Sequence, residues 1–319
     1  MNEDEIRVPI YLITGFLESG KTTFINFTIQ QDYFQIMEPT LLITCEEGEE
    51  EYDEEELAIY NTKLEVIDSK EDFTLEKLQE LEEKYHPDRV VLEFNPLWSV
   101  KELEEEMQLP EGWGIVQQIV TIDGTTAQVY MNNMKSLFVE MVKNADLIMF
   151  NRCDENMPLA NFRRSIKVVN PGGEIVFEDK NREITDIFED SVPYDLDADV
   201  IEIEDVDYGI FYVDLGDHPQ RYYGKTVHFK GMVLKSREAD AEYFVPGRTA
   251  MTCCADDTAF IGYICLSKNA AKIPMGSWVD VTAKVTWQYM EAYGEQGPVF
   301  QAISIKSTTP PEAELVYFN

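Results

Sequence analysis

The sequence predicts an α/β domain with a parallel sheet, followed by a smaller domain made almost entirely of strands. Up to about residue 180, short and nearly continuously apolar runs alternate with amphipathic segments, as expected when strands are covered on both faces. A glycine-rich loop directly follows the first of these runs. After about residue 190 the helical period disappears, and turn residues separate short apolar runs at near-regular spacing.

Strands and helices are expected to alternate along the first half of the chain. The expected strands cover residues 8–14, 40–44, 63–68, 88–94, 114–123, 145–151 and 173–177. The expected helices cover 22–31, 75–85, 100–107, 126–144 and 158–169, with a short helix near 182–188. This alternation favours a parallel sheet, because the chain must cross over the sheet between neighbouring parallel strands.

The second half is expected to form a small barrel. From residue 200 onward we interpret the apolar runs as strands, including IFYVDL at 210–215, and the length suits an OB-like barrel. We therefore assign residues 1–190 to the α/β domain, 191–205 to an acidic linker and 206–319 to the all-β domain.

The charge of the chain argues against two classes of partner. Of 319 residues, 26 are Lys or Arg and 61 are Asp or Glu, which gives a net charge of −35. Such a field repels nucleic acids and anionic lipid surfaces. No apolar run approaches the roughly 20 residues that span a bilayer, the acidic N-terminus does not resemble a secretory signal, and five scattered cysteines do not suit a disulfide framework. We expect a cytoplasmic protein with reduced thiols and no membrane insertion.

The strongest chemical signal is GFLESGKT at residues 15–22, which matches the phosphate-binding pattern GxxxxGK[ST] between an expected strand and an expected helix. Its glycines let successive backbone N–H groups point at phosphate oxygens. Lys21 supplies a cation to the β- and γ-phosphates, and Thr22 offers a hydroxyl to Mg²⁺ at a helix N-terminus. The residues expected to contact nucleotide here are Gly15, Glu18, Ser19, Gly20, Lys21, Thr22 and Thr23.

A second motif indicates which base is bound. Asn151, Arg152, Cys153 and Asp154 follow an expected strand and form a variant of the N-K-x-D guanine-reading sequence. An aspartate there can accept from the N1–H and the exocyclic amine of guanine, whereas adenine offers no matching donors. Asn151, Arg152 and Asp154 are therefore expected to bind GTP.

Acidic residues follow two of the expected strands. Glu93 lies near the end of the 88–94 strand, where P-loop proteins keep a carboxylate that binds Mg²⁺ through water or orients the attacking water. We expect Lys21 and Glu93 to be catalytic, with Thr22, Glu46 and Glu93 around Mg²⁺. The segment CEEGEEEYD at 45–53 also offers Glu49 and Asp53 to the metal. A solvated charge run is the alternative for this segment, and the sequence leaves both interpretations open.

Taken together, six motifs resemble those of the CobW-type GTPases, relatives of HypB and UreG, over about residues 8–180. They are GFLESGKT (15–22), CEEGEEEYD (45–53) against N-E-F-G-E-x-G-x-D, LEFNP (92–96), VTID (120–123), NRCD (151–154) and VNPGGEI (169–175). The resemblance implies GTP hydrolysis that loads or inserts a transition metal, often zinc or cobalt, into a client protein. It also implies roles for Glu46 and Glu93 at Mg²⁺ or in a switch, and for Asn151 and Asp154 at guanine.

The sequence departs from the family pattern at three points. It has no C-x-C-C metal motif after the expected switch strand, and only Cys45 lies there. Pro96 replaces a glycine whose N–H commonly contacts the γ-phosphate, and proline has no N–H to donate. Glu18 stands where glycine is frequent. The missing cysteines argue against metal delivery through the family's usual site, because one thiolate cannot hold a soft cation tightly. The Glu18 carboxylate near the phosphates predicts slow turnover or an additional cation requirement.

The second domain offers its own candidate metal site. GRTAMTCCADDTAFIGYIC at 247–265 is similar to a segment in the C-terminal β domain of YcgQ-type proteins, which accompany predicted permeases. Cys253, Cys254, Asp256 and Asp257 are candidate ligands for a transition metal such as Zn²⁺ or Co²⁺, with Cys265 on the next expected strand as a third thiolate. The alternative is that adjacent cysteines on a strand point to opposite faces, with one of them in the core.

The sequence thus predicts a slow, Mg²⁺-dependent GTPase that acts as a metallochaperone or a metal-homeostasis switch. Its expected partners are GTP and a metal-dependent client protein or metal transporter, with a homodimer also possible. Two alternatives remain: a P-loop kinase that acts on a small molecule, and a nucleotide-gated scaffold that does not hydrolyse.

Overall fold

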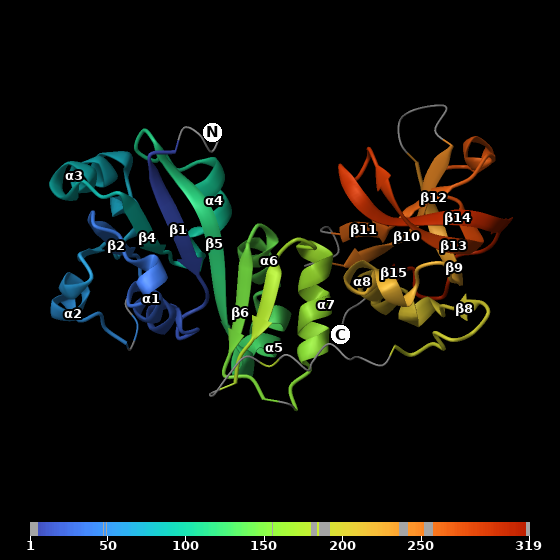
Figure 1. The fold of residues 1–319 in the computed structure, drawn as a ribbon, viewed down its shortest axis with the longest axis horizontal. Coiled ribbons are helices and arrows are strands. Elements are labelled where there is room, and N and C mark those ends of the chain that lie inside the picture. Colours follow the sequence, from blue (N-terminus) through green and yellow to red (C-terminus); the bar gives the residue numbers. More distant parts are fainter. Residues whose placement is uncertain are drawn as a thin grey trace. The chain divides into compact units, whose positions relative to one another are not determined.

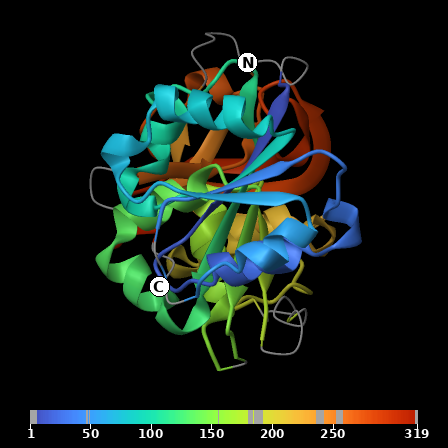
Figure 2. The same ribbon diagram turned by 90° about the vertical axis from the view of Figure 1, so that its left-hand side faces the viewer.

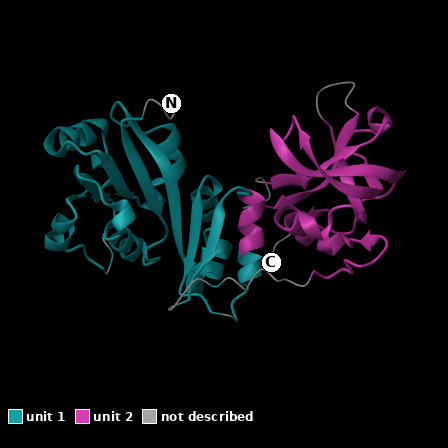
Figure 3. Ribbon diagram, viewed as in Figure 1, with its two compact units in different colours: residues 1–162, 170–187 teal, residues 163–169, 188–319 magenta. Residues whose placement is uncertain are grey.

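The computed structural model describes residues 6–46, 48, 50–154, 156–179, 184, 192–235, 242–251 and 258–316. The chain divides into two compact units (Figure 3). The first comprises Met1–Phe162 and Asn170–Ile187, and the second comprises Arg163–Val169 and Phe188–Asn319.

The first unit is built on a seven-stranded sheet whose order is β3-β2-β4-β1-β5-β6-β7. Every neighbouring pair is parallel, as predicted from the alternation of strands and helices. The strands are β1 (Val8–Thr14), β2 (Thr40–Thr44), β3 (Thr62–Val66), β4 (Arg89–Glu93), β5 (Trp113–Asp123), β6 (Leu147–Asn151) and β7 (Glu174–Phe177). Figures 1 and 2 show them running through the unit with helices packed around them.

Six α-helices of the described residues belong to the first unit, and a seventh, α7, is divided between the two units. They are α1 (Lys21–Ile29), α2 (Glu54–Ile59), α3 (Leu75–Tyr85), α4 (Val100–Glu105), α5 (Gly124–Asn133), α6 (Lys135–Lys143) and α7 (Leu159–Val169). The single helix expected over 126–144 is wrong, because Met134 leaves the helical region (φ −126°, ψ 40°) and separates α5 from α6. The Asn133 amide donates to the Val129 carbonyl there, a local bond that favours a helix end.

A compact apolar cluster fixes α1 and α2 against the sheet. Ile25 and Ile29 of α1 and Leu57 of α2 pack with strand residues such as Ile13 and Val91, all 3% exposed or less. Burying a side chain of this size stabilises the fold by about 1.5–3 kcal/mol. The cluster therefore holds the N-terminus of α1 firmly beside the ends of β1 and β4.

The second unit contains a closed five-stranded barrel. Its strands follow one another in the order β9-β10-β12-β14-β13 and back to β9, with β12 and β14 parallel and the other pairs antiparallel, which confirms the expected OB-like barrel. The strands of this unit are β8 (Ile201–Glu202), β9 (Thr226–Leu234), β10 (Tyr243–Met251), β11 (Thr258–Gly262), β12 (Ile264–Leu266), β13 (Trp278–Met290), β14 (Glu295–Ser307) and β15 (Leu315–Val316).

The strand expected at 210–215 is wrong, because these residues belong to helix α8 (Tyr208–Asp217). Tyr208, Phe211 and Leu215 are 1% exposed or less and recur at helical spacing. The run is apolar on nearly every side, so its sequence shows no contrast between a buried and an exposed face. The short helix expected near 182–188 lies almost wholly outside the described residues.

Within the part of the chain that the structure describes, no helix is both long enough and apolar enough to cross a bilayer.

His228 makes the stability of the barrel depend on pH. Its two ring nitrogens contact Glu202 on β8 and Asp280 on β13. Burial alone would lower the pKa of His228, but the bonds to both carboxylates outweigh burial and raise it. A raised pKa in the folded state stabilises the protein below the unfolded value of about 6.5, and this contribution is lost as the pH rises through the folded value.

We therefore expect His228→Gln to lower the melting temperature most near pH 6, with the difference from the wild type shrinking at higher pH. Thermal unfolding followed between about pH 6 and pH 9 measures this difference. A gap between the two proteins that stays constant over the whole range would contradict the assignment.

Candidate functional site

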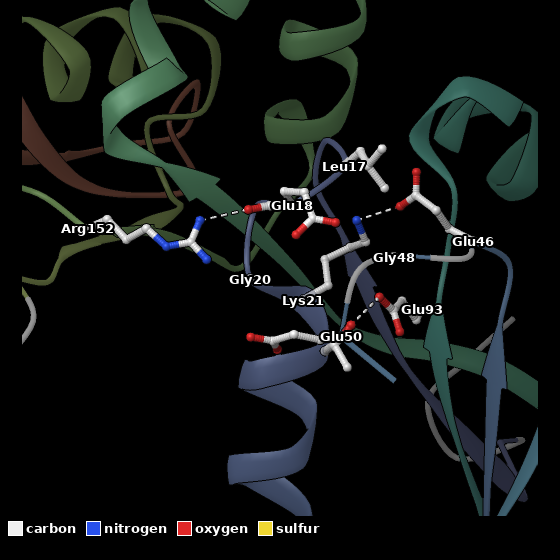
Figure 4. A pocket seen from close by; sticks show the side chains of 10 residues that line it. Leu17, Glu18, Gly20, Lys21, Glu46, Gly48, Glu50, Glu93 and Arg152 are labelled. Atoms are coloured by element: carbon white, nitrogen blue, oxygen red, sulfur yellow. Dashed lines mark hydrogen bonds and ion pairs between the residues drawn. The ribbon is translucent and has the colours of Figure 1, made fainter. Parts of the chain in front are cut away.

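The phosphate loop, the acidic segment and the guanine motif come together at the carboxyl edge of the parallel sheet. A cleft there is lined by residues from all of them (Figure 4): Leu17, Glu18, Gly20, Lys21, Thr22, Glu46, Gly48, Glu50, Glu93 and Arg152. The loop that follows β1 leads directly into α1, and β2, β4 and β6 end beside it. Ligands of open α/β sheets bind at this edge.

Two glycines give the phosphate loop its shape. Gly15 has φ +150°, and a Cβ atom there would lie 2.3 Å from the Thr121 carbonyl oxygen. Gly20 has φ +92° and immediately precedes α1, where a Cβ atom would lie 2.6 Å from Asn151 Nδ2. A side chain does not fit at either position, so glycine is required for the loop to pack against β5 and the Asn151 side chain.

Lys21 is folded back onto its own loop. Its Nζ donates to the carbonyl oxygens of Gly15 at 2.9 Å and Phe16 at 3.2 Å, and the side chain is 4% exposed. The same Nζ forms an ion pair with Glu46 Oε2 at 2.6 Å, as Figure 4 shows. The cation predicted to bind phosphate is therefore held by a carboxylate just beyond β2.

Glu93, the last residue of β4, is the buried carboxylate of the site. Its Oε1 accepts from Thr22 Oγ1 at 3.3 Å, and its Oε2 accepts from the Tyr52 hydroxyl at 2.5 Å. Burial raises the pKa of Glu93, while the Tyr52 hydrogen bond and the Lys21 charge oppose that rise. Burial and the neighbouring Glu93 also raise the pKa of Tyr52, which keeps its hydroxyl protonated as a donor. The sequence analysis did not identify Tyr52, although it is the only aromatic residue within 45–56.

The guanine motif is tied to the phosphate loop. Asn151 Nδ2 donates to the Ser19 carbonyl oxygen at 2.7 Å, and the buried Asn151 Oδ1 has no hydrogen-bond partner among the described residues. Arg152 Nη1 donates to the Glu18 carbonyl oxygen at 2.8 Å and contacts Asp123 Oδ2 at 2.6 Å. Asp154 is exposed and accepts from the Asn156 N–H at 2.7 Å. The Arg152 guanidinium thus joins two loops of the site.

The side chains of the acidic segment make different contacts. Glu46 reaches Lys21, and Glu50 Oε2 accepts from Thr23 Oγ1 at 2.6 Å. Asp53 does not face the cleft as a candidate metal ligand: its carboxylate accepts from the N–H groups of Glu55 and Glu56 and caps α2. An aspartate before a helical run takes this position because the first N–H groups of a helix lack partners. Glu49 lies outside the described residues.

The oxygen-rich set at Thr22 and Glu93 fits Mg²⁺. A hydroxyl and a carboxylate oxygen converge there, and Mg²⁺ prefers hard oxygen ligands. The Glu46 carboxylate lies nearby on Lys21. Thr22, Glu46 and Glu93 are the three residues that the sequence analysis predicts around Mg²⁺.

The described residues contain no group of three or more His, Cys, Asp or Glu side chains arranged to hold a metal. Cys253, Cys254, Asp256 and Asp257, four of the candidate transition-metal ligands, lie outside the described residues. Cys45, Cys153 and Cys265 are buried free thiols. Burial raises the pKa of Cys153 and that of Cys265 to about 12, which disfavours the thiolate form that binds metals.

Two family models match the chain, one in each half. The model of the CobW/HypB/UreG nucleotide-binding domain matches residues 9–177, more than half of the chain. The model of the DUF1980 C-terminal domain matches residues 180–318. A comparison with curated proteins gives no significant match.

Several solved structures are similar to the chain at low identity. The Zn(II)-bound YjiA GTPase from E. coli is 19% identical over 53% of this chain and 56% of its own, with a TM-score of 0.39. The hydrogenase maturation factor HypB from Archaeoglobus fulgidus is 18% identical over 54% of this chain and 81% of its own, with a TM-score of 0.38. HypB from Helicobacter pylori, solved in complex with nickel, is 13% identical over 56% of this chain and 80% of its own, with a TM-score of 0.36. The chain thus spans little more than half the length of YjiA.

Proposed function

Because the chain belongs to the CobW/HypB/UreG family through its nucleotide-binding domain, we propose that it binds GTP with Mg²⁺ and hydrolyses it slowly. The observation that carries this proposal is the convergence of Lys21, Thr22 and Glu93 at the N-terminus of α1. These residues supply a cation, a hydroxyl and a carboxylate within one cleft, the set that phosphoryl transfer from a nucleoside triphosphate requires.

Each residue has a defined task in this proposal. The phosphate-loop N–H groups and Lys21 bind the phosphates, and Lys21 exchanges its ion pair with Glu46 for phosphate oxygens. Thr22 and Glu93 hold Mg²⁺, which when bound neutralises the charge that develops on the phosphates. Asn151 keeps the guanine loop on the phosphate loop, and Asp154 accepts from the base.

We further propose that the protein is cytoplasmic and that its GTP turnover drives the delivery of a metal ion or controls the level of that ion. Family membership supports a metallochaperone or metal-homeostasis switch that acts on a client protein or a metal transporter, as a monomer or a homodimer. Cys253, Cys254 and Asp256 are the proposed ligands for Zn²⁺ or Co²⁺ in the second domain. If chelator-treated protein takes up neither metal in any nucleotide state, the metal part of the proposal is wrong.

Isothermal titration of the whole chain with GTP and with ATP, with and without Zn²⁺, tests the nucleotide part. We expect GTP to bind at least about tenfold more tightly than ATP, because the Asp154 carboxylate finds donors only on guanine. Asp154→Ala is expected to remove most of this preference, whereas Asp32→Ala, at an exposed acid outside the site, is expected to keep it. Equal binding of GTP and ATP by the wild type would contradict the assignment of the guanine motif.

One observation favours a second candidate, a nucleotide-gated scaffold that does not hydrolyse. Pro96 begins the 3₁₀ turn Pro96–Trp98 shortly after β4 and has no N–H to offer the γ-phosphate. In such a scaffold GTP would bind without release of phosphate. A phosphate-release assay on the GTP-bound protein distinguishes the two functions.

A further inference from the structure

We propose that Tyr52 is a positioning residue for Glu93: its hydroxyl holds one carboxylate oxygen so that the other faces Thr22 and the phosphate loop. The inference rests on the proposed GTPase function and adds a residue to its machinery. In the family pattern N-E-F-G-E-x-G-x-D, the position that corresponds to Tyr52 is a free one, so the motif does not assign it a role.

The two oxygens of Glu93 have different partners. Oε2 accepts from the Tyr52 hydroxyl at 2.5 Å, and Oε1 accepts from Thr22 Oγ1 at 3.3 Å. Hydrogen bonds to an ionised carboxylate are stronger than those between neutral groups. The shorter bond therefore fixes the rotation of the carboxylate. As a result, Oε1 points toward the Thr22 hydroxyl, which is proposed to bind the same Mg²⁺.

The backbone alone does not fix this arrangement. In the sheet register Glu93 lies opposite Ile13 of β1 and Thr44 of β2, which places its Cα, but the side chain still has rotatable bonds. Glu93 is 4% exposed, so water cannot readily replace a lost partner. The Lys21 ammonium lies nearby and would attract a released carboxylate oxygen.

Tyr52 is itself held in place. Its ring packs against the apolar cluster formed by α1, α2 and the sheet. The next residue, Asp53, caps α2 and so fixes the backbone that directly follows Tyr52. The hydroxyl therefore reaches Glu93 from a rigid element, which is the condition for positioning a catalytic group within a fraction of an ångström.

The same contact joins the acidic segment to the site. Glu46 and Glu50, earlier in this segment, contact Lys21 and Thr23 on the phosphate loop and α1. Tyr52 contacts the Glu93 carboxylate and also interacts with the Thr22 side chain. The placement of the Glu93 side chain consequently depends on Tyr52 as well as on β4.

Tyr52→Phe tests the inference because it removes only the hydroxyl and keeps the ring. Tyr60→Phe, at the C-terminal end of α2, is the matched control. Four quantities are measured on the full chain: the melting temperature, the kcat and KM for phosphate release from GTP, and the Mg²⁺ concentration that half-saturates binding of a non-hydrolysable GTP analogue. For Tyr52→Phe we expect about a tenfold lower kcat and about a tenfold higher Mg²⁺ requirement, the usual loss for one hydrogen bond to a charged group. The KM for GTP is expected to stay within about twofold of the wild type, because the phosphate loop is unchanged.

The outcomes separate the inference from the function on which it rests. A wild type that fails to bind GTP with Mg²⁺ removes the proposed function and this inference together. A wild type that turns over GTP, with Tyr52→Phe matching it in kcat and Mg²⁺ requirement, overturns the positioning role alone. A lower melting temperature together with a higher KM for GTP, with an unchanged Mg²⁺ requirement, would show a merely structural role and also overturn it.

Tyr52→His provides a second variant, since the imidazole is shorter than the phenol and its nitrogens do not reach the position of the Tyr52 hydroxyl. If Tyr52→Phe is too unstable to assay, Tyr52→His decides the question by its Mg²⁺ requirement relative to the wild type. A requirement raised about tenfold in a variant that melts normally supports the positioning role, because the hydrogen bond to Glu93 has then been lost. A requirement within about threefold of the wild type overturns it.

Discussion

Lys21→Ala is expected to lower the affinity for GTP by at least about 100-fold, because a charge-assisted hydrogen bond contributes roughly 1.5–3 kcal/mol and Lys21 is proposed to contact more than one phosphate. Its Nζ lies in the curve of the loop, bound to the Gly15 and Phe16 carbonyl oxygens. From there, a small movement of the Lys21 side chain would allow Nζ to leave the Glu46 carboxylate and bind phosphate oxygens instead. Isothermal titration or a fluorescent GTP analogue measures the change.

Lys21→Ala also leaves Glu46 without its cation, and that side chain is only 12% exposed. The double variant Lys21→Ala/Glu46→Gln removes this unpaired carboxylate and separates lost phosphate binding from lost stability. Lys101→Ala, at an exposed lysine of α4, is the control and is expected to bind GTP as the wild type does. GTP affinity retained within about threefold in the double variant would rule out Lys21 as the phosphate cation.

The sequence predicted those parts of the fold and site that depend on neighbouring residues. Apolar runs bounded by turns located each strand of the parallel sheet, because strands covered on both faces need apolar side chains throughout. GFLESGKT specified a loop whose glycines have positive φ, and this requirement can be read from residue type alone.

The parts that the sequence did not predict depend on contacts between distant residues. Tyr52 and Glu93 are 41 positions apart, and they meet because β4 pairs with β1 and β2 in a register that no local pattern specifies. Asp53 looked like a metal ligand within an acidic run, but the helix that follows it uses its carboxylate as a cap. Helix α8 was mistaken for a strand because it is buried on nearly all sides, which removes the period that distinguishes the two.

Glu93→Gln is expected to reduce the rate of GTP hydrolysis by about 100-fold while GTP binding changes by less than about tenfold. Glutamine has nearly the same shape and can still accept from Tyr52 through its amide oxygen. It carries no negative charge, so it is a poorer ligand for Mg²⁺ and cannot act as a base toward water. Single-turnover phosphate release, with Glu83→Gln at an exposed position of α3 as the control, measures the effect.

The same substitution is not expected to lower the melting temperature near pH 7. Burial raises the pKa of Glu93, so the fold disfavours its ionised form, and a neutral side chain removes that cost at pH values above the raised pKa. The expected signature of Glu93→Gln is therefore a protein that folds at least as well as the wild type, binds GTP and scarcely hydrolyses it, since active sites often retain charges that reduce stability. A variant with wild-type turnover would show that the carboxylate has no part in hydrolysis. A large loss of melting temperature would show instead that Glu93 stabilises the fold through Thr22 and Tyr52.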